Sequence, residues 1–178
     1  MKTGFFLLLL VVCTGPTRAQ KPVYYTVWAD GLANPQLAKS SFYLLGTGVR
    51  GEFSKSLRAS RNRLFTQVGY ARFFQKATSA FTANIGLVTV GYRYQSRRAF
   101  NASVGVGVQY WSERMRVHFP DYAINETLNS LMPSATVALG VRINPRVGLA
   151  LEYQGLFKPE SGSIMLRNTV VLSLGYTF

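Results

Sequence analysis

Few side chains in this 178-residue sequence could carry out nucleophilic, acid–base or metal chemistry. It contains one histidine, His118, and one cysteine, Cys13. Structural metal sites take several thiolate or imidazole ligands, and a serine triad needs a histidine beside a serine and an acid. Asp121 lies near His118 in the sequence, but no serine follows at a suitable strand spacing. The sequence therefore predicts no catalytic residue, no cofactor-binding residue and no metal site.

Charged residues offer a second kind of chemistry, because several of them stand among small residues in otherwise apolar stretches. Those that we expect to share one interior are Arg50, Glu52, Arg93, Arg142, Glu152 and Arg167. One interpretation is a salt-bridged polar core, which we favour, and the other is a narrow arginine-lined path for small anions. We also expect Glu152 and Arg167 to meet diagonally across the last hairpin.

The elements that position these charges show a period of two, which is typical of β-strands. In the closing segment, large apolar residues such as Leu172 and Leu174 alternate with small or polar ones such as Ser173 and Gly175. Similar alternation, or strand-like composition, recurs along the chain. The eight predicted strands are residues 23–29, 42–53, 64–74, 87–95, 100–111, 134–144, 146–157 and 164–178. A bulge near residues 85–86 is expected to continue the fourth strand upstream.

The N-terminus predicts export. Lys2 precedes an apolar run at residues 5–12, and Thr17-Arg18-Ala19 supplies small residues before a cleavage point. We therefore expect a signal peptide at residues 1–19 and a mature domain at residues 20–178. The run has about half of the ~20 apolar residues that a spanning helix needs. A lipoprotein signal at Cys13 is the alternative, although Val12 stands where such signals prefer a small residue.

Composition and alternation together predict an all-β fold: an eight-stranded antiparallel up-and-down transmembrane β-barrel. Hydrophobic residues make up 48% of the chain and charged residues 15%, which excludes a disordered basic tail. No later segment is long and apolar enough for a spanning helix, and a closed barrel is the other structure that can cross a bilayer. The rival is a secreted soluble barrel that binds lipid. The presumed outward faces of the last four strands carry no charge, which favours the membrane barrel.

Loop lengths and charges predict an orientation. The connections at 30–41 and 112–133 are long, whereas those at 96–98 and 144–146 are tight, and transmembrane barrels keep short turns on the periplasmic side. The mature chain has 18 basic and 7 acidic residues, a net charge of +11, and the bases gather in the short turns. Such a rim would attract anionic lipid headgroups. Arg72 is the one predicted lipid-facing charge, unless the face assigned to its strand is shifted by one residue.

The chain resembles the outer-membrane β-barrel family of Gram-negative bacteria, in particular small eight-stranded members similar to outer membrane proteins A and X, in a style common among Bacteroidota. The resemblance rests on the signal ending at Ala19 and on the closing alternation at Leu172, Leu174, Tyr176 and Phe178, which is similar to the signal read by the barrel-assembly machinery. It implies location in the cell outer membrane. It also implies handling by periplasmic chaperones and the assembly machinery, and contact with outer-membrane lipids.

For function, the resemblance implies a non-enzymatic structural or surface-interaction role. Residues 112–133 combine apolar and charged side chains and are the predicted site for an extracellular ligand; the alternative is that they extend the fifth and sixth strands beyond the membrane. A narrow pore for small solutes, anions among them, and a secreted lipid-binding barrel remain as other functions. The basic residues lie on turns without an aromatic platform between them, so nucleic acid is not an expected partner.

Overall fold

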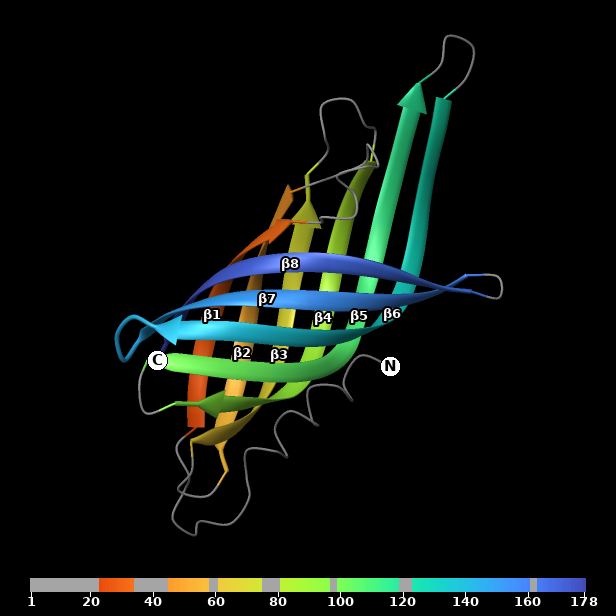
Figure 1. Ribbon diagram of the computed structural model, residues 1–178. Helices are drawn as coiled ribbons and strands as arrows, with labels where there is room; N and C mark the ends of the chain where they lie inside the picture. Colours follow the sequence, from red (N-terminus) through yellow and green to blue (C-terminus); the bar gives the residue numbers. More distant parts are fainter. Residues whose placement is uncertain are drawn as a thin grey trace, which may run out of the picture.

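The protein is described by a computed structural model that covers residues 23–33, 45–57, 61–74, 81–96, 99–118, 123–160 and 163–178. Eight antiparallel strands form one closed barrel, in which each strand pairs with its neighbours in sequence (Figure 1). The strands are β1 (Val23–Ala33), β2 (Leu45–Ser56), β3 (Asn62–Phe73), β4 (Phe81–Gln95), β5 (Phe100–His118), β6 (Ala123–Arg142), β7 (Val147–Glu160) and β8 (Ser163–Thr177).

The barrel closes by pairing β1 with β8, from Thr26 opposite Thr177 to Ala33 opposite Val170. This closure confirms the predicted eight-stranded up-and-down architecture. None of the described residues belongs to a helix long and apolar enough to cross a membrane. The predicted signal peptide at residues 1–19 lies outside the described residues.

Two strand predictions need correction. The register of β4 with both neighbours runs without interruption from Phe81 to Gln95, so the expected bulge at residues 85–86 is absent. Continuous alternation instead turns Ala83 and Ile85 into the barrel, where both are buried. The first strand runs four residues beyond the predicted 23–29 and thereby brings Asp30 out of the expected loop and into the wall of the barrel.

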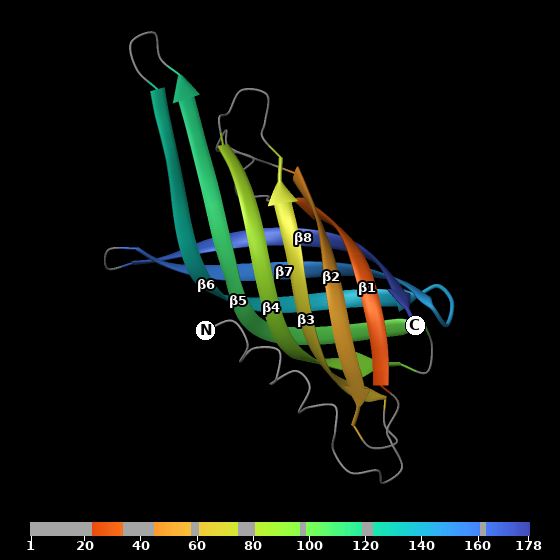
Figure 2. The same cartoon turned by 180° about the vertical axis from the view of Figure 1, so that it is seen from behind.

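The predicted loop at 112–133 is wrong for most of its length. β5 and β6 pair continuously from Phe100 opposite Val141 to His118 opposite Ala123, and residues 119–122 lie outside the described chain. Both strands project beyond the others at one end of the barrel (Figures 1 and 2). We call residues 112–118 of β5, the first four of which still pair with β4, together with residues 123–133 of β6, the β5–β6 arm, and we call this end of the barrel the arm end. The alternative interpretation, strand extension, is the one that the structure confirms.

The arm also leaves part of β6 without a strand partner on its other side. β7 pairs with β6 only from Ser134 to Arg142, and beyond that point β7 continues with β8 alone, to Glu160 opposite Ser163. The β7–β8 hairpin and the arm therefore diverge, as both ribbon views show. Among the described residues, no strand pairs with the β7-facing edge of β6 between Ala123 and Pro133.

At the opposite end, which we call the turn end, the connections are short. Between β6 and β7 the side-chain oxygen Oδ1 of Asn144 accepts hydrogen bonds from the backbone N–H groups of Arg146 and Val147, each at 2.8 Å. An asparagine that caps the following backbone in this way is a favourable turn former. The predicted tight turn at 144–146 is confirmed.

The two faces of the wall differ sharply. Outward side chains are large, apolar and exposed: Val106 is 62% exposed, Leu172 60% and Leu139 52%. Most inward positions on the same strands are buried, among them Ser103, Ala138 and Ser173. The predicted assignment of faces is confirmed in β5, β6 and β7 and in the described side chains of β8, and Arg72 is exposed on the outward face of β3, as predicted.

Candidate functional site

The barrel interior has two zones stacked along its axis. Toward the arm end, buried apolar side chains pack together in it, and four large ones have no exposed surface. These are Phe73, Trp111, Met132 and Leu156. Phe73 and Trp111 stack with ring centroids 5.7 Å apart. We expected small and polar side chains throughout, so this apolar plug, the cluster built around these four residues, corrects that expectation.

The middle of the barrel holds a polar network centred on Arg50, which is only 2% exposed. Its guanidinium binds Asp30 through two hydrogen bonds, from Nε at 2.7 Å and from Nη2 at 3.0 Å. Nη1 donates to Glu152 at 2.6 Å and to Gln67 at 3.2 Å, and Nη2 also donates to Ser173 at 2.8 Å. A guanidinium has five N–H donors. All five of those of Arg50 are therefore used.

Glu52 is the second centre of the network. Its carboxylate accepts two hydrogen bonds from Arg93, at 2.5 and 2.8 Å, and one from the indole of Trp28 at 3.1 Å. Gln67 joins the two centres, because its amide donates to Glu52 at 2.8 Å while its oxygen accepts from Arg50. The Arg93 guanidinium also lies 4.9 Å from the ring centroid of Phe65, a favourable cation–π arrangement.

A chain of amides connects the network to the apolar plug. Trp111 donates to Gln109 at 3.1 Å, Gln109 donates to Gln154 at 2.9 Å, and Gln154 donates to Glu152 at 2.7 Å. Among the described side chains, every strand except β6 thus contributes at least one to a connected set of hydrogen bonds. Polar groups buried in this way need partners to offset their lost hydration. The network therefore fixes the packing of the interior.

The structure brings together four of the six predicted interior charges: Arg50 contacts Glu152, and Arg93 contacts Glu52. Arg142 does not join them, because it lies exposed at the turn end of β6. Position 167 lies opposite Leu156, four residues along β8 from the partner of Glu152. The expected diagonal pairing of Glu152 with Arg167 is therefore wrong in register; the side chain of Arg167 lies outside the described part of the chain.

Sequence reasoning missed Asp30 and Trp28, which are both buried inside. The signal was present, because Thr26, Trp28, Asp30 and Leu32 occupy alternate positions along β1. All four point inward. One face of this strand carries both a tryptophan and an aspartate, so that face is neither clearly apolar nor clearly polar. Alternation alone therefore did not show which face of β1 points inward.

A glycine makes room for the buried indole. A Cβ atom on Gly175 would stand 2.5 Å from the Trp28 ring, closer than any normal nonbonded contact. The two residues are register partners across the β1–β8 closure. A small residue opposite a large one is how a narrow barrel accommodates a bulky interior side chain.

The chemistry available to this interior is limited because most of its described polar groups already have hydrogen-bond partners, with Arg93 Nε, Ser134 Oγ and Thr169 Oγ1 as exceptions. The guanidinium of Arg50 has no donor left for a ligand, and the described residues include no group of three or more His, Cys, Asp or Glu that could hold a metal ion. His118 belongs to β5, but its side chain is outside the described set. The interior is thus arranged as a packed core.

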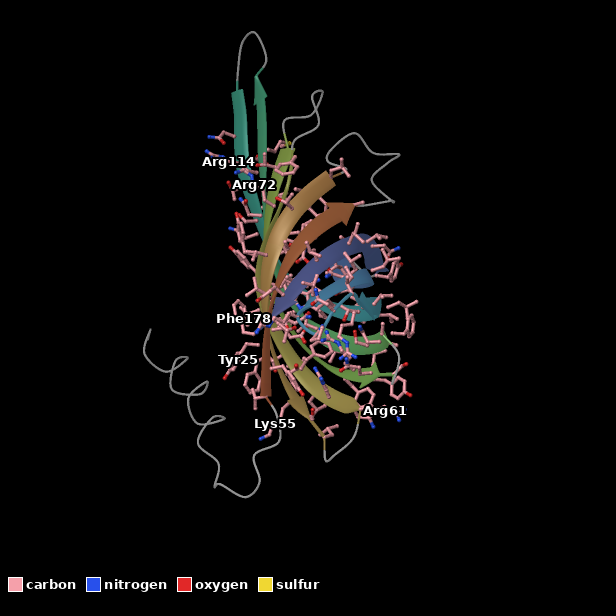
Figure 3. The ribbon with its side chains drawn as sticks, turned by 90° about the vertical axis from the view of Figure 1, so that its left-hand side faces the viewer. Tyr25, Lys55, Arg61, Arg72, Arg114 and Phe178 are labelled. Atoms are coloured by element: carbon pink, nitrogen blue, oxygen red, sulfur yellow. The ribbon has the colours of Figure 1, made fainter. Side chains whose placement is uncertain are left out.

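The rims of the barrel carry different side chains at its two ends. Figure 3 places Lys55, Arg61, Tyr25 and Phe178 toward the turn end, and Arg72 and Arg114 toward the arm end. Four basic side chains are exposed at the turn end, and no described Asp or Glu side chain is exposed beside them. They are Lys55, Arg61, Arg142 and Arg146. Tyr176 packs edge to face with Phe178 and accepts a hydrogen bond from Arg146 at 3.3 Å.

Solved structures of the same architecture match this chain over most of its length. The N-terminal β-barrel domain of OprF from Pseudomonas aeruginosa has 12% sequence identity and a TM-score of 0.59, and the match covers 90% of this chain and 100% of that one. This is the fold of the small outer-membrane β-barrels. Ail, the attachment invasion locus protein of Yersinia pestis, solved with the heparin analogue sucrose octasulfate, has 11% identity and a TM-score of 0.58, over 89% and 99% of the two chains.

A barrel from the de novo design of transmembrane β-barrels has 19% identity and a TM-score of 0.53, over 89% of this chain and 98% of the design. No family model and no curated protein matches the sequence. At these identities the likeness concerns the fold, and the function must be argued from the residues.

Removing the Arg50 guanidinium is expected to destabilise the barrel strongly. Arg50→Met leaves Asp30 and Glu152 buried without their cation, which costs about 3 to 5 kcal/mol in comparable buried pairs. Urea unfolding of the refolded protein, followed by the fluorescence of the interior tryptophans, measures the change.

Two further variants check the cause. Adding Asp30→Asn and Glu152→Gln to Arg50→Met should recover part of the loss, because the neutral amides no longer need a cation. Arg61→Met at the exposed turn end should change the free energy of unfolding by about 0.5 kcal/mol or less. Equal effects of Arg50→Met and Arg61→Met would contradict a central role for the network.

Proposed function

We propose that the chain is exported and spans the outer membrane as a non-conducting, non-enzymatic structural barrel whose arm end faces the cell exterior and takes part in surface interactions. One observation carries this proposal: the outward faces of all eight strands present large apolar side chains, while the salt bridges lie inside. A protein of this kind would associate in water through so much exposed apolar surface. The hydrocarbon core of a bilayer is a favourable environment for the same apolar surface. The closed barrel also leaves no unpaired backbone edge within its wall.

The packed interior supports a structural role over a pore. The apolar plug blocks the axis toward the arm end with four side chains that have no exposed surface. Below it, each donor of Arg50 already has an acceptor, so an anion would have to break existing hydrogen bonds to pass. Eight strands leave an interior about as wide as the side chains that fill it.

The ends of the barrel support the orientation. Short turns and exposed bases lie at one end, and the long β5–β6 arm lies at the other, as in barrels with periplasmic turns and extracellular loops. The bases at the turn end suit contact with anionic phospholipid headgroups of the inner leaflet. The exposed, outward Leu172, Leu174, Tyr176 and Phe178 near the end of β8 suit recognition by the assembly machinery and by periplasmic chaperones.

The arm supports a surface-interaction role. Its β6 edge lacks a strand partner among the described residues, and Leu128 in the same strand is 60% exposed. Exposed sheet edges and apolar side chains are common means of binding another chain, and exposed cations such as Arg114 bind acidic groups. Ail, which shares the fold, was solved with a heparin analogue, so an anionic polysaccharide is a suitable probe for the arm.

A charge placed in the middle of the outward face tests the membrane assignment. Val106→Arg should lower the free energy of unfolding in lipid vesicles by about 2 to 4 kcal/mol, because arginine at the bilayer midplane loses its hydration. Leu128→Arg, on the arm, should have little effect. A soluble barrel would tolerate both changes equally, so no difference between them, or solubility of the wild-type barrel without detergent, would refute the proposal.

Planar-bilayer recordings test the closed interior. The refolded wild-type protein should give no steady conductance steps, whereas a general porin in the same bilayers provides the positive control. Steady conductance steps that disappear in the Arg142→Gln variant would instead establish an anion path past the turn end. They would overturn the conclusion that the apolar plug closes the interior.

Shortening the arm tests its interaction role. Replacing residues 113–128 with Asn-Gly joins the register partners Ser112 and Asn129 by a two-residue hairpin turn and removes both Arg114 and Leu128. Cells that display this variant should lose adhesion to heparin-coated surfaces, and a Gly/Ser segment of the original length serves as the matched control. Unchanged adhesion by a folded, surface-displayed short variant would reject the role of the arm.

A further inference from the structure

The outward face of β3 to β6 changes from apolar to polar at one row of register partners. The last apolar row consists of Tyr70, Gly86, Tyr110 and Leu131. The next outward rows, toward the arm end, consist of Arg72, Asn84, Ser112 and Asn129, and then of Thr82, Arg114 and Thr127, with Asn125 beyond them. We call these eight residues the outward polar band. Beyond this row the described outward side chains of β4, β5 and β6 are polar, whereas on β3 Arg72 is followed by the exposed Phe74. The row therefore marks the upper limit of the apolar wall on β4 to β6.

The band is chemically one-sided. It contains two guanidiniums together with amides and hydroxyls, and it contains no carboxylate. The acids of these strands, Glu113 and Glu126, occupy positions of the opposite parity; Glu113 lies opposite Ala83, which is fully buried. Neither Arg72 nor Arg114 forms a salt bridge with any carboxylate in the described part of the chain. An array of donors with two cations is suited to an anion.

Side-chain contacts within the band leave these donors available. Tyr70 donates its hydroxyl hydrogen bond to Asn84 at 2.7 Å, which orients the amide. Arg114 uses Nε for a long contact of 3.4 Å to Asn125, and no hydrogen bond between described residues uses its two terminal nitrogens. Both arginines are exposed on the same side of the barrel (Figure 3).

The spacing of the two cations indicates the size of the ligand. Arg72 and Arg114 are separated by two strands and two residues along the strand, which corresponds to roughly 12 Å between Cα atoms from the usual strand spacing and rise. The headgroup of phosphatidylglycerol or phosphatidylethanolamine presents one phosphate. A saccharide headgroup with a phosphate at each end presents two phosphates and several hydroxyls, and it matches both the cations and the amides and hydroxyls between them.

We propose that the outward polar band binds the phosphorylated saccharide headgroup of an outer-leaflet lipid. Arg72 and Arg114 each hold a phosphate through charge-assisted hydrogen bonds, and Asn84 and Ser112 hydrogen-bond the sugar between them. The acyl chains lie against the apolar row that begins with Tyr70 and Tyr110. The proposal rests on the proposed function, because it requires the arm end of a membrane-spanning barrel to face the outer leaflet.

Native mass spectrometry of the refolded chain in detergent tests the site, with bisphosphorylated lipid A as the probe. Arg72→Gln and Arg114→Gln should each weaken binding about tenfold, and the double variant about a hundredfold, since each loses one charge-assisted contact. The double variant Lys55→Gln/Arg61→Gln removes the same charge from the turn end and should bind like the wild type. Heat-modifiable migration on gels verifies that every variant is folded.

Two other lipids identify the headgroup. Dephosphorylated lipid A should bind the wild type as weakly as intact lipid A binds Arg72→Gln/Arg114→Gln, and phosphatidylglycerol, with one phosphate and no sugar, should bind at least tenfold more weakly than lipid A. Equal binding of lipid A by the wild type and the Arg72→Gln/Arg114→Gln variant would overturn the site. Equal binding of phosphatidylglycerol and lipid A by the wild type would overturn the proposal that the site recognises a saccharide headgroup.

The same material separates this inference from the proposed function. If the wild type inserts into phospholipid vesicles as a heat-modifiable barrel but does not discriminate among these lipids, only the lipid site is wrong. If it does not insert at all, the membrane assignment itself fails.

Discussion

A guanidinium enclosed by a wall that faces hydrocarbon must find all of its hydrogen-bond partners inside the barrel. Arg50 meets this requirement with Asp30, Glu152, Gln67 and Ser173, which come from four other strands. Losing any one of these strands from the wall would leave a buried charge unsatisfied, and an unpaired buried charge is among the most costly defects in a protein. The network therefore specifies one closed arrangement of strands, whereas the apolar outer surface would tolerate many.

Because the barrel is narrow, its large interior side chains lie next to glycines that leave room for them. The ring of Trp28 can lie over the adjacent strand β8 because Gly175 has no side chain there, and Phe65 lies against Gly91 of its neighbouring strand in the same way. The two zones of the interior are filled by different kinds of side chain. Charges and amides occupy the middle, while Phe73, Trp111, Met132 and Leu156 exclude water above them. The chain thus combines a membrane protein's exterior with an interior that is packed like that of a small soluble domain.

Alternation predicted the fold well because a period of two survives wherever one face of a strand meets lipid. It placed Arg50, Glu52, Arg93 and Glu152 inside and Arg72 outside. It failed where both faces resemble each other. The arm carries polar side chains on both faces, so its sequence resembles a loop. On β1, the presence of Trp28 and Asp30 on one face hid which face points inward. Contacts between strands far apart in sequence, such as Arg50 with Glu152, depend on barrel closure and register, which no local pattern contains.

The seam between the first and last strands joins residues such as Thr26 and Thr177, whose hydroxyl groups are 2.9 Å apart although 151 positions separate them in the sequence. A ring sealed by its most distant segments must close late, because the entropy of bringing them together is lost before their contacts form. Once sealed, the ring has no free strand from which to fray. Opening must therefore break a whole ladder at once, so the lifetime of the protein depends on the height of that barrier more than on its equilibrium stability.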